Sequence, residues 1–341
     1  MIEVTDLVKR YGDHTAVDHV SFTIEDGKIY GLLGPNGAGK STTMNILTGF
    51  LCANEGTVVV NGYDILKQTE KAKAQIGYLP EIPPLYDDMT VREYLEFVCE
   101  LKKVPREQIE EEMKRVSAKT GIEDHGERLI RNLSKGFKQR VGIAQALISS
   151  PKIIILDEPT VGLDPLQIIE IRDLIRELKQ DHTVILSSHI LSEVSAVCDE
   201  ILIISKGKLV AQDSAENLSK LSGGAHELRL LVKGETEQVL AAAAGVVRED
   251  ACQAQAEGEG VRLNISVEEG QDIREALFYA LAAAKLPILE MSSQKASLEE
   301  VFIELTSKDE MGSVEETEEE TEEEEETKET GEEADDHAGD L

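Results

Sequence analysis

Polar and apolar residues alternate in short runs along the first sixty positions, a pattern that predicts β-strands. The runs cover residues 3–8, 20–25, 28–33 and 58–61, and Asp26-Gly27 marks a tight turn before the third. That third run leads directly into a glycine-rich loop, and a helix is expected from about Lys40. The chain is therefore expected to begin with a β-rich edge followed by a strand, a loop and a helix.

Residues 83–150 show a different pattern, with apolar residues at helical spacing among charged ones, chiefly over 91–101 and 108–120. An apolar, β-branched run returns at 153–156, as expected for a strand buried on both faces. A helix at 166–179, a strand at 183–187, a helix at 191–197 and a strand at 201–205 follow. This alternation predicts an α/β domain over residues 1–220, with a mainly parallel sheet and a helical insert at about 83–150.

Two further segments follow this domain. Residues 221–306 predict a small C-terminal α/β domain, with strands at 226–232, 261–267 and 287–291 and helices at 272–284 and 298–305. Residues 307–341 form an acidic tail of low complexity, and from Asp309 onward 18 acidic residues stand against one lysine. Such a composition cannot bury enough apolar surface to fold, so a disordered tail is expected.

Charge and composition exclude several classes of function. The formal net charge is −32 and aromatic residues make up 4% of the chain, whereas nucleic-acid binding needs a basic surface. The four cysteines are not at metal-ligand spacing, so neither a disulfide framework nor a zinc site is expected. No signal peptide is apparent, and no apolar run approaches the ~20 residues that span a bilayer. Any action at a membrane is therefore expected to depend on a partner.

The glycine-rich loop carries the strongest chemical signal. It matches the Walker A pattern, in which successive backbone N–H groups and a helix N-terminus bind phosphate. Lys40 is expected to reach the β- and γ-phosphates of a nucleotide, and the Ser41 hydroxyl to bind Mg²⁺. The expected nucleotide-binding residues of this segment are Gly34, Pro35, Asn36, Gly37, Ala38, Gly39, Lys40, Ser41 and Thr42.

A second motif ends the apolar strand at 153–156, where Asp157 and Glu158 follow directly. This arrangement matches the Walker B pattern, in which a strand delivers two carboxylates to one edge of a sheet. Asp157 is expected to hold Mg²⁺ through water, and Glu158 to polarise the water that attacks the γ-phosphate.

The remaining motifs resemble those of ABC-type ATPases. Leu133-Ser134-Lys135-Gly136-Phe137 resembles the ABC signature and lies between the two Walker motifs. Pro159-Thr160 and Gly162-Leu163-Asp164-Pro165 look like the D-loop, and Ser187-Ser188-His189 looks like the switch histidine. The resemblance covers roughly residues 2–220 and implies a P-loop NTPase fold of the ABC nucleotide-binding type.

This resemblance also implies individual roles. Tyr11 matches the aromatic residue that stacks on adenine, and His189 matches the residue that touches the γ-phosphate and the attacking water. Ser134 and Gly136 would contact the γ-phosphate bound to a second copy. The implied assembly is a homodimer that encloses ATP and Mg²⁺ between Walker A of one copy and the signature of the other. Integral membrane permease subunits would hold it at the cytoplasmic face of the membrane.

The chain departs from the usual pattern at two places. Lys135 and Phe137 replace the second Gly and the Gln of the signature, so Leu221-Ser222-Gly223-Gly224 is literally closer to it. That segment follows the switch histidine and precedes an expected strand, so it is interpreted as a decoy. Glu81 stands where most ABC domains carry Gln. Its carboxylate either contributes to the Mg²⁺ site, directly or through water, or faces solvent.

The C-terminal segment Ser297-Leu298-Glu299-Glu300-Val301-Phe302 resembles the ending of ATPase subunits of ABC-2-type exporters. Burial of an amphipathic helix explains the same pattern. The resemblance therefore implies the ATP-binding and ATP-hydrolysing subunit of an ABC transporter, powering export through separate membrane-spanning subunits. The alternative function is a soluble ABC ATPase that acts on DNA or ribosomes, but such proteins carry long coiled-coil inserts, paired cassettes or basic segments that are lacking here. A third interpretation, ATP binding without turnover, is opposed by the presence of Glu158 and His189.

Overall fold

The computed structural model describes residues 1–220, 226–248, 251–258, 260–267, 271–295 and 302. It divides into two compact units, Met1–Asn217 and Leu218–Leu341, and each is described by itself. The acidic tail, the signature decoy around Ser222 and the expected helix at 298–305 lie outside the described residues, apart from Phe302.

The N-terminal unit is built on two sheets. A four-stranded antiparallel sheet has the order β2-β1-β4-β5, and a six-stranded sheet has the order β10-β9-β3-β8-β7-β6. All neighbours in the larger sheet are parallel except β10 and β9. The strands are β1 (Ile2–Tyr11), β2 (His14–Ile24), β3 (Ile29–Leu33), β4 (Glu55–Val60), β5 (Tyr63–Asp64), β6 (Ile76–Leu79), β7 (Ile153–Leu156), β8 (Thr183–Ser188), β9 (Glu200–Ser205) and β10 (Lys208–Asp213).

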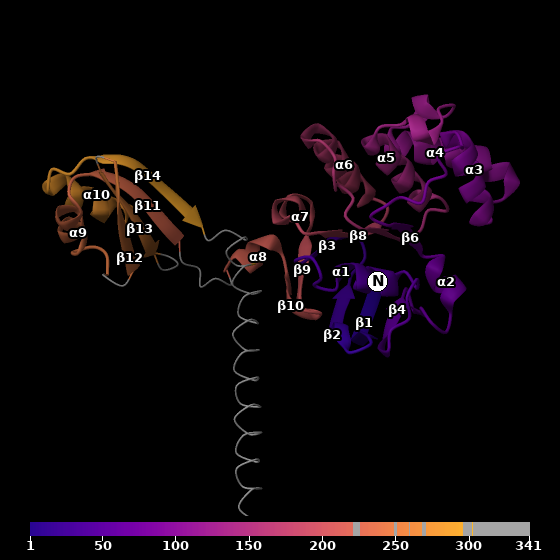
Figure 1. The fold of residues 1–341 in the computed structure, drawn as a ribbon, viewed down its shortest axis with the longest axis horizontal. Coiled ribbons are helices and arrows are strands. Elements are labelled where there is room, and N and C mark those ends of the chain that lie inside the picture. The colour runs from indigo at the N-terminus through magenta and orange to yellow at the C-terminus, as the bar shows by residue number, and fades with distance from the viewer. Residues whose placement is uncertain (221–225, 249–250, 259, 268–270, 296–301, 303–341) are drawn as a thin grey trace, which may run out of the picture. The chain divides into compact units, whose positions relative to one another are not determined.

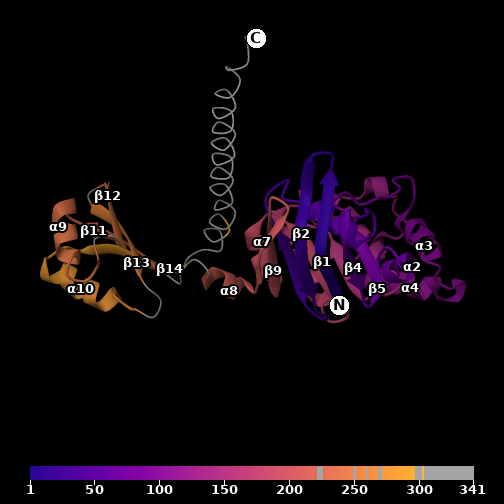
Figure 2. The same cartoon turned by 90° about the horizontal axis from the view of Figure 1, so that it is seen from below.

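Helices cover the parallel sheet, whose central strands are buried along their whole length. Every residue of β3, β7 and β8 is buried, as expected for strands packed on both faces. Figure 1 shows the smaller sheet and α1 on one side of the larger sheet and α5 and α6 on the other, and Figure 2 shows the smaller sheet face-on. The helices outside the insert are α1 (Lys40–Leu47), α2 (Thr69–Lys73), α6 (Pro165–Leu178), α7 (Leu191–Val197) and α8 (Ala215–Lys220).

The predicted helical insert contains α3 (Val91–Leu101), α4 (Arg106–Thr120) and α5 (Lys135–Leu147), with short 3₁₀ turns at Glu123–His125 and Ile130–Asn132. A capping box at Thr90 and Glu93 begins α3. Lys102, just after α3, donates from Nζ to three carbonyls at the C-terminal end of α5, at 2.9–3.2 Å. A cation satisfies acceptors that a helix end leaves open, so this contact fastens α3 to the helix that begins at the signature.

The C-terminal unit is a four-stranded antiparallel sheet, with the order β12-β13-β11-β14 and two helices on one face. Alternate residues of β11 and β13 are buried against Val239 of α9 and Leu277 and Leu281 of α10. Its chain order is β-α-β-β-α-β, which is the ferredoxin-like arrangement. The elements are β11 (His226–Lys233), α9 (Thr236–Ala243), β12 (Cys252–Glu257), β13 (Gly260–Val267), α10 (Arg274–Ala283) and β14 (Ile288–Lys295).

Candidate nucleotide site

The glycine loop joins β3 to α1 with very little space around its backbone. A Cβ on Gly34 would lie 2.3 Å from the carbonyl oxygen of Ile204, and one on Gly39 would lie 2.4 Å from that of Ala16. Gly39 also has a φ of 102°, which side chains disfavour. The fold therefore requires glycine at both positions, and the loop delivers the N-terminus of α1 to the surface.

Lys40 lies beneath this loop and is only 6% exposed. Its Nζ donates to the carbonyls of Gly34 at 2.8 Å and Pro35 at 3.2 Å, and it lies 4.0 Å from Glu158 Oε1. Burial lowers the pKa of Lys40, while the nearby carboxylates of Glu158, Asp157 and Glu81 raise it. The nearby carboxylates therefore favour the protonated form of the Lys40 amine. This amine lies beneath the loop that is expected to bind phosphate.

Asp157 and Glu158, which follow β7, are both buried, and one hydroxyl binds the side chain of the first and the backbone of the second. Ser187 Oγ donates to Asp157 Oδ1 at 2.5 Å and accepts from the Glu158 backbone N–H at 2.9 Å. Burial raises the pKa of Asp157, whereas hydrogen bonds from Ser187 and Ser41 lower it. Glu158 has a φ of 47°, an uncommon backbone conformation for a residue with a side chain. This turn directs its carboxylate toward Lys40 and away from the strand.

His189 follows β8 and faces the same carboxylate. Its Nδ1 lies 3.0 Å from Glu158 Oε2 and 3.1 Å from Oε1. Because Glu158 is also close to Lys40, the three side chains form one contiguous chain of polar contacts. A carboxylate, an imidazole and a buried amine are thereby placed together at the edge where β3, β7 and β8 end.

A cavity of about 440 Å³ opens over this edge. Tyr11, exposed at the end of β1, lies on its wall, and the Lys9 ammonium is 5.2 Å from the centre of its ring. The expected site residues that line the cavity are Tyr11, Asn36, Gly37, Gly39, Lys40, Ser41, Thr42, Glu81, Glu158 and His189. Gly34 and Pro35 instead bind Lys40 through their carbonyls, Ala38 is buried, and Asp157 lies behind Glu158.

The signature residues do not line this cavity. Ser134 is exposed and begins α5, where its Oγ accepts from the Phe137 backbone N–H at 3.4 Å. Gly136 is buried against α6, since a Cβ there would lie 2.7 Å from Gln167 Cδ. Phe137 stacks on His125, with ring centres 4.0 Å apart. The signature thus forms a separate surface of the same unit.

Four residues at the site were not predicted from the sequence, and one of them, Val161, lines the cavity just after the Walker B segment. His14 and Ala16 line the cavity because the β1–β2 hairpin pairs Tyr11 with His14. A hairpin predicted to turn at Gly12 would have paired His14 with Tyr11 and so placed His14 at the cavity wall. Ser187 was recognised only as the neighbour of the switch histidine. Its role depends on β7 and β8 being adjacent, and the sequence does not fix which strands are neighbours.

A glycine loop over a buried lysine, beside an acidic strand end, defines the site of a P-loop ATPase. The sequence profile described as "ABC transporter" matches residues 17–161. Linearmycin resistance ATP-binding protein LnrL of Bacillus subtilis (strain 168) is 32% identical over 310 residues, which cover 90% of this chain and 99% of that protein. The chain belongs to the ABC transporter ATP-binding proteins, and it is the ATP-binding and ATP-hydrolysing subunit of such a transporter.

One further relative and two solved structures support the same family. Bacitracin transport ATP-binding protein BcrA of Bacillus licheniformis is 37% identical and covers 64% of this chain and 72% of its own. The solved structure titled "Structure of ATP binding subunit of ABC transporter" superposes with a TM-score of 0.60 at 30% identity, covering 65% of this chain and 93% of that one. "Dimeric Structure of MJ0796, a Bacterial ABC Transporter Cassette" gives 0.58 at 26% identity, covering 63% and 98%. The predicted family and fold class are confirmed.

Proposed function

We propose that the cavity binds ATP with Mg²⁺ and that three residues carry out hydrolysis. Lys40 binds the β- and γ-phosphates, Glu158 polarises the attacking water, and His189 positions that water and the γ-phosphate. The observation that carries this proposal is the convergence of Lys40, Glu158 and His189 in one cavity, with Glu158 4.0 Å from the amine and 3.0 Å from the imidazole. Tyr11, on the cavity wall, would stack on adenine.

The residues at the loop fit a magnesium ion. The Ser41 hydroxyl lies close enough to Asp157 to lower the pKa of its carboxyl, so two oxygen donors of the kind Mg²⁺ prefers are near each other. Within the described part of the chain, no three His, Cys, Asp or Glu side chains gather as a metal-binding group. Few protein ligands suit Mg²⁺, which in nucleotide sites keeps waters and phosphate oxygens. A bound Mg²⁺ would neutralise phosphate charge, and Glu81, also on the cavity wall, is available as a further ligand or through water.

We propose that hydrolysis requires a head-to-tail homodimer. Ser134 is exposed and lies outside the cavity of its own chain, where it caps a helix whose N-terminus favours anions. A second copy would bring Ser134 and Gly136 to the γ-phosphate of the first. The likeness to a solved cassette whose title calls it dimeric supports this arrangement.

We also propose that the dimer powers export through separate integral membrane permease subunits, at the cytoplasmic face of the membrane. Among the described residues no helix is long and apolar enough to cross a bilayer. Ile82 is 82% exposed and Tyr86 is 52% exposed, both just after Glu81, so the segment offers an apolar contact for a partner. The names of LnrL and BcrA, a resistance protein and a transport protein, support an exporter.

Two measurements test this function. Lys40→Ala should abolish phosphate release from ATP and weaken ATP binding, because the cation at the phosphates is lost; Lys103→Ala, at an exposed loop, is the control. Near-normal turnover in Lys40→Ala would refute the site. The tagged chain should also co-purify with a polytopic membrane protein from detergent-solubilised membranes of its source cells. Co-purification with ribosomes or DNA instead would favour the soluble alternative.

A further inference from the structure

The charge of the cavity is not balanced within one chain. Glu81 and Glu158 line it, Asp157 lies directly behind, and Lys40 is the cation between them. Glu81 acts on this group electrostatically, since its charge raises the pKa of both Lys40 and Asp157. Its carboxylate is exposed, and among the described residues it makes no ion pair. ATP would bring further negative charge to the same wall.

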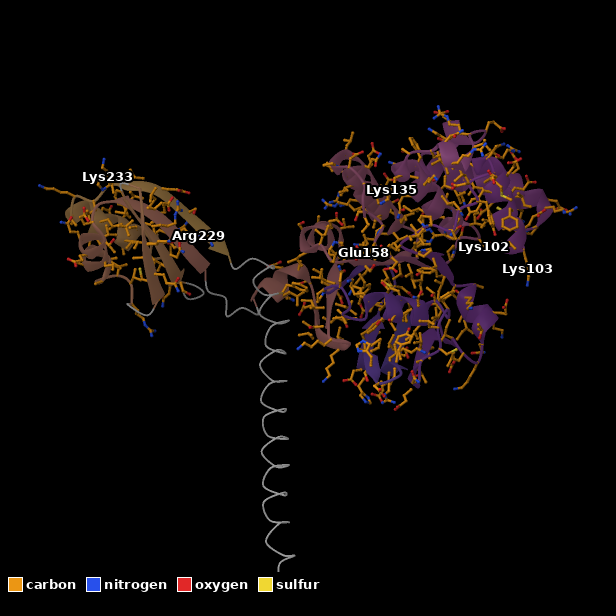
Figure 3. The ribbon with its side chains drawn as sticks, viewed as in Figure 1. Lys102, Lys103, Lys135, Glu158, Arg229 and Lys233 are labelled. Carbon is orange, nitrogen blue, oxygen red and sulfur yellow. The ribbon has the colours of Figure 1, made fainter. Side chains whose placement is uncertain are left out.

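An unbalanced cation lies on the signature surface. Lys135 is the first residue of α5, directly after Ser134, and its side chain is exposed. Three other basic residues around this helix end have carboxylate partners: Arg131 with Asp88, Lys138 with Asp87 and Arg140 with Glu170, at 2.8–3.0 Å. Within the described residues Lys135 has none. Figure 3 shows its side chain together with that of Glu158.

The ammonium group of Lys135 lies beside Gly162 of the D-loop. A Cβ built on Gly162 would lie 2.1 Å from Lys135 Nζ, and Gly162 has a φ of 69°. The amine therefore lies against bare backbone, where a larger residue would collide with it. The cation thus lies between the signature helix and the D-loop, on the surface that the proposed dimer turns toward the second nucleotide site.

We infer that Lys135 of one subunit neutralises Glu81 at the nucleotide site of the other. The inference rests on the head-to-tail dimer proposed above, which brings the signature surface of one chain over the cavity of its partner. The extra carboxylate and the extra cation are then two halves of one contact, made only when the dimer closes around ATP. A cation supplied in trans stabilises the γ-phosphate charge as well as the carboxylate.

Charge reversal in separate chains tests this contact without relying on hydrolysis. All variants are made in a Glu158→Gln parent, and the ATP-Mg²⁺ concentration that gives half-maximal dimer is measured by analytical ultracentrifugation. Glu81→Lys alone and Lys135→Glu alone each place like charges at both sites, and each should raise this concentration at least tenfold. An equimolar mixture of the two variants should return to within about threefold of the parent, because opposite charges then face each other at both sites.

Lys103→Glu is the control variant. It reverses one exposed charge on a loop outside the cavity and should change the ATP-Mg²⁺ concentration for half-maximal dimer by less than twofold. If the double variant in one chain recovers dimerisation but the mixture does not, the contact is within a chain and the inference is overturned. Failure of both to recover overturns it too. If the parent forms no dimer with ATP-Mg²⁺, the proposed dimer itself fails, and this inference with it.

Discussion

Substitution of Ser187 tests how Asp157 and Glu158 are positioned at the end of β7. Its hydroxyl is fully buried and binds both residues, as donor to the Asp157 carboxylate and as acceptor for the Glu158 backbone N–H. Ser187→Ala removes both bonds without adding volume. Glu158 then loses the acceptor that stabilises its uncommon backbone turn, and Asp157 loses a donor that favours its charged form.

The size of the effect follows from the cost of an unpaired buried group, about 1–3 kcal/mol. If most of this falls on the transition state, turnover should drop about 10–100-fold, since ~1.4 kcal/mol corresponds to tenfold. The pH profile should change as well. Burial already raises the pKa of Asp157 and the Ser187 hydrogen bond opposes this rise, so the pKa increases further in the variant. Activity that needs the ionised carboxylate would then be lost at a higher pH on the acid side.

The assay is phosphate release at saturating and limiting ATP-Mg²⁺ across the acid range. Ser188→Ala is the matched control, because this neighbour is equally buried but its hydroxyl bonds to Glu193 and the Ile190 backbone N–H instead. The control should keep its acid limb and turn over within about threefold of wild type. Equal losses in both variants, or an unshifted acid limb in Ser187→Ala, would show that Ser187 does not position the carboxylates.

Three further outcomes follow from the structure and the sequence. Ser134→Arg should block hydrolysis, whereas Ser222→Arg should leave phosphate release near normal; the reverse pattern would identify the wrong signature. Burial lowers the pKa of Lys102 to about 8. Between about pH 8 and 10 the Lys102 amine therefore binds more protons in the unfolded chain than in the folded one. The free energy of unfolding of wild type, minus that of Lys102→Met, should rise with pH in denaturant titrations by at most ~1.4 kcal/mol per pH unit. A difference that does not change with pH would contradict this. Truncation after Lys308 should keep the ATPase rate within about twofold at 0.15 M salt, because residues 309–341 contain no nucleotide-site motif and solvent-exposed charges more than ~8 Å apart are largely screened. A tenfold loss would contradict this expectation.

The sequence predicted the parts of the site that depend on neighbouring residues in the chain. The strand at β7 and the helix at α7 lie where periodicity placed them, at Ile153–Leu156 and Leu191–Val197. The glycine loop was predicted because phosphate binding needs a strand, close backbone approach and a helix start within a few residues. Both features depend on residues that are close together in the sequence, so the residue types alone are enough to predict them.

Features that depend on which strands pair were not predicted. Periodicity of two identifies a strand but not its neighbour, so Ser187 could not be assigned to Asp157 before β7 and β8 were known to be adjacent. The same limit concealed the antiparallel order of the C-terminal sheet, whereas β12 was missed because its alternating residues are small and none is fully buried. The stack of His125 on Phe137 joins a 3₁₀ turn to α5, and neither residue type predicts this contact from the sequence.

The central claim is that two copies enclose ATP and that Glu158 drives its hydrolysis, and Glu158→Gln tests both parts in one preparation. The carboxylate that polarises water contributes roughly 10²–10⁴-fold, so the amide should bind ATP, release almost no phosphate and accumulate as an ATP-bound dimer. Gel filtration with ATP-Mg²⁺ should show a dimer that is absent with ADP. A monomer under both conditions, together with phosphate release near the wild-type rate, would contradict the account.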